Sequence, residues 1–278
     1  MKKILVTGRN GYVASNLIRN LNKNYYRVTC IGRNSNDINL YDYDNIKKAV
    51  KNSDVIVHLA AIINPFDKEI WKINVNYTKF IVNEAKKFNK KFIYLSTQNV
   101  LFGKDNYSKT KKEAEKVVKT LNNYVILRPT IIYGKNENRY VGRLIGIIKN
   151  SYFVPIIGDG EHKLQPIYID DLIKIIKNCI NKNIKGIFLI PGRSIISYNE
   201  LIDLIAKKLN LKRIKIHFPI WFIRPFAYLF QIFLKNPPVT SVQLNNIKMD
   251  QAYETKQIEK LFNINLKTIN QGLDEIIK

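Results

Sequence analysis

The chain has little cysteine, few acidic residues and no long uninterrupted apolar run. Its two cysteines, Cys30 and Cys179, lie inside apolar segments without the spacing of metal ligands. This pattern excludes a disulfide framework and a cysteine-based zinc site, and we expect both thiols to be buried and reduced. No stretch is apolar and long enough to predict a membrane-spanning helix. The first residues lack the apolar segment and cleavage site of a signal peptide, so we expect a cytoplasmic protein.

Acidic residues are outnumbered by basic ones, with 22 Asp and Glu against 46 Lys and Arg, for a formal net charge of +24. Such an excess is found in proteins that bind nucleic acid or anionic lipid. Here the lysines are spread over the whole sequence and form no arginine-rich block. We therefore interpret the charge as a compositional bias of the surface and predict no nucleic-acid partner. The excess still favours anionic ligands such as diphosphates.

Strand-like and helix-like segments alternate through the first half of the chain. Apolar runs of the kind buried in parallel sheets are separated by segments with helical spacing of apolar residues. This alternation predicts an α/β fold with a doubly wound parallel sheet of the Rossmann type, over residues 1–130. The predicted strands are Lys2–Thr7, Tyr26–Ile31, Asp54–Leu59, Phe92–Leu95 and Tyr124–Leu127, and the predicted helices include Tyr12–Leu21, Glu69–Phe88 and one that carries Tyr107.

The pattern loosens after Pro129. Residues 131–278 are expected to form mostly a smaller, substrate-binding lobe over the carboxyl ends of the strands, with some segments returning to the first domain. Expected elements there include strands at Pro166–Ile169 and Ile187–Ile190, and helices at Asp171–Ile180 and Tyr198–Leu209. No Gly- or Pro-rich linker separates the two parts.

A short glycine-containing segment between the first strand and the first helix predicts a dinucleotide site. Gly8 permits a tight turn, Gly11 lets the backbone approach a pyrophosphate, and Ala14 allows close packing of helix on strand. The second strand ends at Gly32-Arg33, where NAD-binding proteins often carry an acidic residue. Because Arg33 and Arg9 offer cations for a 2′-phosphate instead, the sequence favours NADP slightly over NAD.

Tyr107 and Lys111 are spaced to share one face of a helix, ten residues or more after Thr97. A neighbouring ammonium lowers the pKa of a phenol toward the range used in acid–base chemistry. A hydroxyl at the end of the preceding strand would hold a substrate oxygen beside that phenol. These three residues are the predicted catalytic group.

Taken together, the motifs resemble the extended short-chain dehydrogenase/reductase family, within the NAD-dependent epimerase/dehydratase group. The resemblance runs in order over nearly the whole chain. It rests on Thr7-Gly8-Arg9-Asn10-Gly11, His58-Leu59-Ala60-Ala61, Asn74-Val75-Asn76, Tyr94-Leu95-Ser96-Thr97, Tyr107-Ser108-Lys109-Thr110-Lys111, Leu127-Arg128-Pro129-Thr130, Ile157-Gly158-Asp159-Gly160 and Ile169-Asp170-Asp171-Leu172.

The resemblance implies roles for particular residues. Tyr107 would be the general acid/base, Lys111 would order the nicotinamide ribose, and Thr97 would bind the reacting substrate oxygen. Asn39-Leu40, or alternatively Asp37-Ile38, stands where the family contacts adenine. The implied cofactor-binding set is Gly8, Arg9, Asn10, Gly11, Tyr12, Val13, Arg33, Asn39, Leu40, Leu59, Ala60, Ala61, Asn74, Tyr107, Lys111, Arg128, Pro129 and Thr130.

The implied activity is hydride transfer on a nucleotide-diphosphate sugar, as a 4-epimerase or a 4-keto reductase. Leu101-Phe102-Gly103 resembles the reductase branch, and Tyr77 replaces a glycine that is usual after the Asn-Val pair. The alternative is a non-catalytic NAD(P)H-binding subunit or assembly factor. Its support is a tail, Pro237 to Thr240 followed by Met249-Asp250, that is similar to the branch associated with respiratory complexes. Retention of the three catalytic residues argues against it.

The segment His217–Leu234 is dense in aromatic and aliphatic residues. We expect a helix packed against the second lobe, with a helix resting on a membrane surface as the less favoured alternative. The resemblance also makes a homodimer plausible.

Overall fold

The computed structural model describes residues 1–33, 38–233, 244, 250 and 252–277. These residues form two compact units. Unit 1 consists of Met1–Pro129, Ile169–Ile190 and Leu261–Ile264, and unit 2 of Thr130–Tyr168, Pro191–Lys260 and Asn265–Lys278. The tail segment from Pro237 to Thr240 and Met249 lie outside the described residues, as does Asp37.

Unit 1 is built on a seven-stranded sheet with the order β11-β6-β5-β4-β1-β2-β3. All its neighbouring strands are parallel. The strand order reverses direction at β1, as in a doubly wound sheet, which confirms the predicted fold class. The strands are β1 (Lys2–Thr7), β2 (Tyr26–Gly32), β3 (Ile38–Asn39), β4 (Val55–His58), β5 (Lys91–Leu95), β6 (Tyr124–Pro129) and β11 (Gly186–Ile190).

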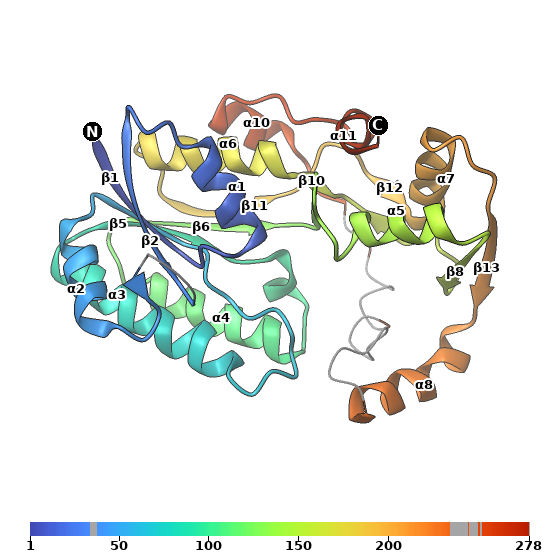
Figure 1. Ribbon diagram of the computed structural model, residues 1–278, viewed down its shortest axis with the longest axis horizontal. Coiled ribbons are helices and arrows are strands. Elements are labelled where there is room, and N and C mark those ends of the chain that lie inside the picture. Colours follow the sequence, from blue (N-terminus) through green and yellow to red (C-terminus); the bar gives the residue numbers. More distant parts are fainter. Residues whose placement is uncertain (34–37, 234–243, 245–249, 251, 278) are drawn as a thin grey trace. The chain divides into compact units, whose positions relative to one another are not determined.

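Helices cover both faces of this sheet (Figure 1). Helices α1 (Tyr12–Asn20) and α6 (Ile169–Asn181) lie on one face; α2 (Tyr43–Asn52), α3 (Thr78–Lys87) and α4 (Asn106–Val118) lie on the other. Alternate strand residues face opposite sides, so the sheet supplies two apolar layers. The layer beneath α2, α3 and α4 includes Leu5, Ile31, Ile56, Phe92 and Ile126, each fully buried. Burying a side chain of this size contributes about 1.5–3 kcal/mol.

Helix α4 begins at a cap that the sequence supplies. The carboxylate of Asp105 accepts hydrogen bonds from the Ser108 backbone N–H at 2.9 Å and from the Ser108 hydroxyl at 2.8 Å. An acidic side chain at this position accepts a hydrogen bond from an otherwise unpaired N–H of the first turn. Its negative charge also interacts favourably with the positive end of the helix dipole. The cap therefore fixes where the helix starts, one turn before Lys111.

The helix predicted over Glu69–Phe88 is divided in the structure. A π-helical segment, η1 (Lys72–Tyr77), precedes α3. Asn74 lies in this segment. Its side-chain oxygen accepts a hydrogen bond from the Ile62 N–H, and its side-chain NH2 donates one to the Ile62 carbonyl. Irregular helical turns of this kind occur often at functional sites.

Unit 2 contains short strands and four complete helices among its described residues. The strands are β7 (Ile132–Tyr133), β8 (Phe153–Ile157), β9 (Lys163–Leu164), β10 (Ile167–Tyr168), β12 (Ile196–Ser197) and β13 (Ile214–Phe218). The helices are α5 (Val141–Asn150), α7 (Tyr198–Lys208), α8 (Ile220–Phe233) and α11 (Ile269–Ile276); α10 (Lys256–Phe262) spans the boundary between the units. Within the part of the chain that the structure describes, no helix has both the length and the apolar character needed to cross a membrane.

Candidate active site

The turn after β1 has the conformation that the glycine pattern predicts. Gly8 has φ +76°, and a Cβ there would lie 2.7 Å from both Cα and N of Ala60. Only glycine therefore fits without a shift of the backbone below it. The Gly11 N–H donates to the Gly8 carbonyl at 2.8 Å, and Gly11 is the N-cap of α1. No acidic residue lies in the first turn of that helix, so its N-terminus suits an anionic group.

The backbone under this turn is fixed by a buried threonine. The Thr7 hydroxyl oxygen accepts from the N–H groups of Leu59 and Ala60, each at 3.2 Å. The same oxygen lies 2.8 Å from Nδ1 of His58. Thr7 and His58 are fully buried. The end of β4 is thus held against the end of β1, directly below Gly8.

The hydrogen bonds of His58 determine its tautomer. Its Nε2 lies 2.9 Å from the Thr78 hydroxyl, which donates its proton to the Asn74 carbonyl at 2.8 Å. The Thr78 oxygen must therefore accept from Nε2–H, and Nδ1 must accept from Thr7. Burial, followed by repulsion from Lys111, lowers the pKa of His58 to about 3. His58 is consequently neutral at pH 7 and acts as a structural link, with no role in proton transfer.

Asn74 extends this polar network to the helix that carries the predicted catalytic residues. Its side-chain NH2 donates to the Ile62 carbonyl at 2.9 Å and to the Thr110 hydroxyl at 3.1 Å. Thr110 in turn donates to the Tyr107 carbonyl at 2.9 Å. Asn74 is 1% exposed, so these bonds are shielded from water. The amide therefore supports the first turn of α4 from below.

Lys111 is the most unusual ionisable group of unit 1. Its side chain is 2% exposed, and its Nζ donates to the Leu95 carbonyl at the end of β5, at 2.6 Å. The ammonium also lies 4.1 Å from the centre of the Tyr94 ring, a cation–π distance. Burial lowers the pKa of Lys111 to about 7, although Glu115 acts in the opposite direction. A buried lysine with a perturbed pKa at the strand ends is typical of a functional site.

Tyr107 and Thr97 belong to the same region as Lys111. Tyr107 is half-buried in the first turn of α4, four residues before Lys111. The pKa of Tyr94 is raised, chiefly by burial of its own ring and next by its electrostatic interaction with Tyr107. The ammonium of Lys111 lies over the same Tyr94 ring. Thr97 is 9% exposed and caps the short 3-10 helix Gln98–Leu101, where its hydroxyl accepts from the Asn99 N–H at 3.3 Å. Phenol, ammonium and hydroxyl thus come from the end of β5 and the first two turns of α4.

A buried ion pair ties β5, β6 and α4 together. Glu115 is 2% exposed and accepts from Arg128 at 2.8 Å and 2.5 Å in a bidentate pair. It also accepts from the Ser96 hydroxyl at 2.6 Å. Bidentate pairs of this type are geometrically specific. The resemblance implies that Arg128 binds the cofactor. In the structure its guanidinium pairs with Glu115 and so links the end of β6 to α4.

The other predicted cofactor residues are distributed along the ends of the strands. Arg33 is exposed and pairs with Glu69 at 3.9 Å, a distance typical of a weak surface pair. The side chain of Leu40 packs in the apolar core, which leaves Asn39 as the polar member of that pair. Thr130 starts unit 2, and its hydroxyl donates to the Gln165 carbonyl at 2.6 Å. Arg9, Asn10 and Tyr12 are at least partly exposed, whereas Val13 faces the core and Pro129 ends β6.

Sequence reasoning did not single out Tyr94, Glu115 or Thr110. Each lies within a motif or helix face that was identified: Tyr94 three residues before Thr97, Thr110 between Tyr107 and Lys111, and Glu115 four residues after Lys111. The available signal was helical spacing, because residues four apart share a face. The pairing of Glu115 with Arg128 requires the strand order and has no local signal.

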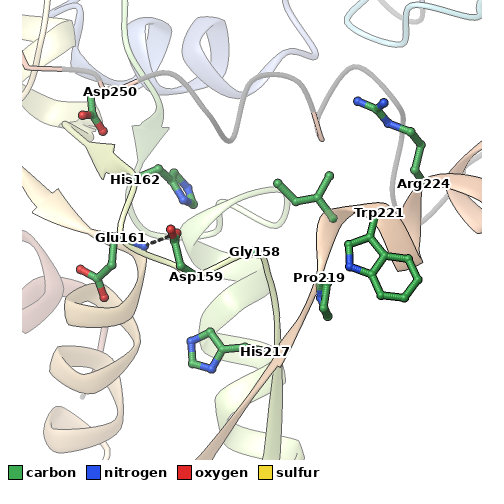
Figure 2. Close-up of a pocket in the computed structure, with 10 residues that line it drawn as sticks. Gly158, Asp159, Glu161, His162, His217, Pro219, Trp221, Arg224 and Asp250 are labelled. Carbon is green, nitrogen blue, oxygen red and sulfur yellow. Dashed lines mark hydrogen bonds between the residues drawn. The ribbon is translucent and has the colours of Figure 1, made fainter.

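Unit 2 contains a separate cavity of about 850 Å³. Figure 2 shows Trp221 and Arg224 of α8 on one side of it and Asp159, His162 and Asp250 on the other. The imidazole of His162 stacks on Tyr198 at 5.6 Å, and burial lowers the pKa of that imidazole. The lining is mixed in charge, with an aromatic wall.

Residues 4–190 match the model of the NAD dependent epimerase/dehydratase family. The chain belongs to this family. The match includes the glycine turn, the polar network below it and the helix with Tyr107 and Lys111. The family membership predicted from the motifs is therefore confirmed.

The proteins similar to this chain include 4-epimerases of UDP-sugars. UDP-glucose 4-epimerase of Vibrio cholerae is 29% identical over 271 residues, which cover 82% of this chain and 82% of that protein. The structure of UDP-glucuronic acid 4-epimerase from Bacillus cereus in complex with NAD matches with a TM-score of 0.69 and 26% identity, over 78% of this chain and 87% of that one. The structure of dTDP-4-dehydrorhamnose reductase from Bacillus anthracis in complex with NADP matches with a TM-score of 0.76 over 99% of each chain, but at 20% identity it shows a shared fold alone.

Proposed function

We propose that this protein is a nicotinamide-dinucleotide-dependent 4-epimerase of a nucleotide-diphosphate sugar. The observation that carries the proposal is the buried Lys111, whose Nζ donates to the Leu95 carbonyl. Thr97 follows Leu95 by two residues, and Tyr107 precedes Lys111 by about one turn on α4. The similarity to two UDP-sugar 4-epimerases, one over 82% of both chains, supports the same reaction.

The residues at the strand ends fit a dinucleotide. The φ of +76° at Gly8, together with its close approach to Ala60, leaves a turn over which a diphosphate can lie without meeting a side chain. The uncapped N–H groups at the start of α1 face no acidic side chain of that helix's first turn. A bound nicotinamide would supply reversible hydride transfer at the sugar carbon. The predicted set from Gly8 to Val13, with Leu59, Ala60 and Ala61, would hold the diphosphate and adenosine side.

The chain's own residues move and hold the proton. Thr97 Oγ1 binds the hydroxyl at the reacting sugar carbon, and Tyr107 Oη takes the hydroxyl proton and later returns it. Lys111 has three N–H groups as an ammonium, one of which goes to the Leu95 carbonyl. The other two would be available to the phenolate and to the ribose hydroxyls of a bound cofactor. Acid–base catalysis of this kind contributes about 10²–10⁴-fold in rate.

A substrate panel tests the proposal. The purified protein is incubated with UDP-glucose, UDP-glucuronic acid, UDP-N-acetylglucosamine and dTDP-4-keto-6-deoxyglucose, with NAD, NADP or NADPH, and the sugars are separated by chromatography. Formation of a 4-epimer without net change in the dinucleotide absorbance is expected. Net oxidation of NADPH would replace the epimerase assignment by the 4-keto reductase. No reaction with any sugar, together with tight dinucleotide binding, would favour the non-catalytic binding subunit.

Cofactor choice is tested separately by titration. Gly32 and Arg33 at the end of β2 favour NADP, while the nearby Glu69 partly neutralises Arg33. We expect Arg33→Ala to weaken NADP binding more than NAD binding. An equal effect on both, or tighter NAD binding by the unmodified chain, would remove the preference for NADP.

A further inference from the structure

Helix α8 presents aromatic side chains to solvent. Trp221 is 75% exposed, and Phe222 and Phe226 are each 45% exposed. The rings of Trp221 and Phe222 lie 6.0 Å apart, and those of Phe222 and Phe226 lie 5.6 Å apart, so they form one cluster. Exposed aromatic clusters of this kind mark interaction surfaces in soluble domains.

The spacing of these residues shows that α8 faces outward with its most apolar side. Trp221 and Pro225, and likewise Phe222 and Phe226, are four residues apart and share one face. All four are exposed, whereas Ala227, on the opposite side of the helix, is fully buried. Among these residues only the small Ala227 is buried, and the four larger side chains are exposed.

A second apolar strip precedes α8 on the paired strands β8 and β13. Ile214 pairs with Phe153, and Ile216 pairs with Pro155. Phe153, Ile214 and Ile216 are exposed by 50%, 46% and 37%, because alternate residues of each strand point to the same side. The exposed aromatic face of α8, formed by Trp221, Phe222 and Phe226, is here called the apolar surface. The strip lies on the strands that precede it in unit 2.

The segment that carries the apolar surface is basic, whereas the acidic residues Asp159, Glu161 and Asp250 line the cavity beside Trp221. Residues 211–227 contain Lys212, Arg213, Lys215 and Arg224 but no Asp or Glu. Lys215 is paired with Asp203 at 2.7 Å, and Arg213 donates to backbone carbonyls of α5, so these two cations remain on the flank of the strip. Tryptophan and phenylalanine flanked by lysine and arginine are the side chains that enter the headgroup region of a bilayer.

We propose that the apolar surface docks on an anionic lipid bilayer. The aromatic rings of α8 insert at the level of the headgroups, and the flanking cations, with the net charge of +24, add electrostatic attraction to anionic lipids. The docking is peripheral. It is independent of the proposed reaction, since none of the predicted catalytic residues lies in residues 211–227.

Co-sedimentation of the intact protein with vesicles tests this docking. The probes are vesicles of phosphatidylcholine alone and vesicles of phosphatidylcholine mixed with phosphatidylglycerol. We expect binding to the anionic vesicles that weakens with salt. The double substitution Trp221→Ser with Phe222→Ser should weaken binding by about tenfold or more, because two exposed aromatic side chains lose their burial. The single substitution Lys212→Glu should weaken it by about fivefold or more.

The matched control is Tyr25→Ser, which removes a 68% exposed aromatic side chain from unit 1 and should leave vesicle binding unchanged. Equal binding of the double variant and the unmodified protein would overturn the proposal. A monomeric protein that does not bind anionic vesicles would overturn it as well. A dimer seen by sedimentation velocity and lost in the double variant would assign the surface to a second copy instead.

Discussion

The strand ends of unit 1 and the apolar surface of unit 2 use their side chains in opposite ways. At the strand ends, Thr7, His58, Thr78 and Asn74 form a chain of hydrogen bonds that leaves few polar atoms for solvent. On α8, large rings are left in water and the small Ala227 is buried. The first arrangement makes a rigid site before any ligand arrives. The exposed rings of α8 would lower the free energy only when a binding partner removes them from water.

This difference predicts which substitutions affect chemistry, which affect binding, and which affect folding. In unit 1, the substitution at the acid/base residue should affect chemistry most, the one at the glycine turn binding, and the one in the buried polar network folding. In unit 2, substitutions on α8 should affect vesicle binding.

Tyr107→Phe should reduce turnover by about 10²–10⁴-fold, because it removes the group proposed to transfer the proton. Dinucleotide affinity should change little, since the ring remains in the first turn of α4. The measurements are the rate of 4-epimer formation and a fluorescence titration with the cofactor. Tyr25→Phe, at an exposed position, is the control. Full activity in Tyr107→Phe would remove the phenol from the mechanism.

Gly8→Ala should weaken dinucleotide binding by about 10–100-fold. A Cβ at φ +76° is strained by about 1–3 kcal/mol and meets the backbone of Ala60 at 2.7 Å, so the turn must shift. Gly146→Ala is the control, because a Cβ there has no neighbour within 4 Å and the residue lies in α5. Unchanged affinity in Gly8→Ala would contradict the placement of the diphosphate over this turn.

Thr7→Val should lower the free energy of unfolding by about 1–3 kcal/mol. The substitution keeps the side-chain shape but leaves the N–H groups of Leu59 and Ala60 without their acceptor. Chemical denaturation measures the effect. Thr29→Val, at an exposed position of β2, should change stability by no more than a few tenths of that amount. Equal effects of the two variants would mean that the polar network contributes nothing to rigidity.

Lys111→Met should change how stability depends on pH. The folded chain releases the Lys111 proton near pH 7, below the ordinary value of 10.5 in the unfolded chain. Between these values the unfolded chain holds more protons, so this group makes the free energy of unfolding rise with pH, by up to about 1.4 kcal/mol per pH unit. In the variant, the free energy of unfolding should no longer rise with pH on account of this group. The variant should therefore be more stable than the unmodified chain, with the largest difference below about pH 7. Parallel pH profiles of the two proteins would show that burial does not perturb Lys111.

Much of unit 1 was predictable because its signals are local. The strand Lys2–Thr7 agrees with the structure at both ends, since an apolar run there meets a glycine turn. The segment 69–88 was predicted as one regular helix because its apolar spacing is continuous. The π-helical turn at Lys72–Tyr77 accompanies the bonds between Asn74 and Ile62, which lie twelve residues apart and leave no trace in periodicity.

The candidate site was predictable in its residue types and less so in their partners. Tyr107, Lys111 and Thr97 follow from spacing and order. That Lys111 is buried, or that Arg128 is held by Glu115, depends on which strands are neighbours. The exposure of α8 was least predictable, because an apolar helix has the same sequence whether its rings face a core or water.

The two tryptophans of the chain fall in different units, Trp71 in unit 1 and Trp221 in unit 2. Both indoles are accessible, at 44% and 75%. Replacing either one by phenylalanine would leave a single tryptophan, whose emission, excited selectively over the 16 tyrosines, then follows one half of the molecule. The chain thus carries its own pair of spectroscopic labels, and unfolding of the two halves can be followed separately without attaching a dye.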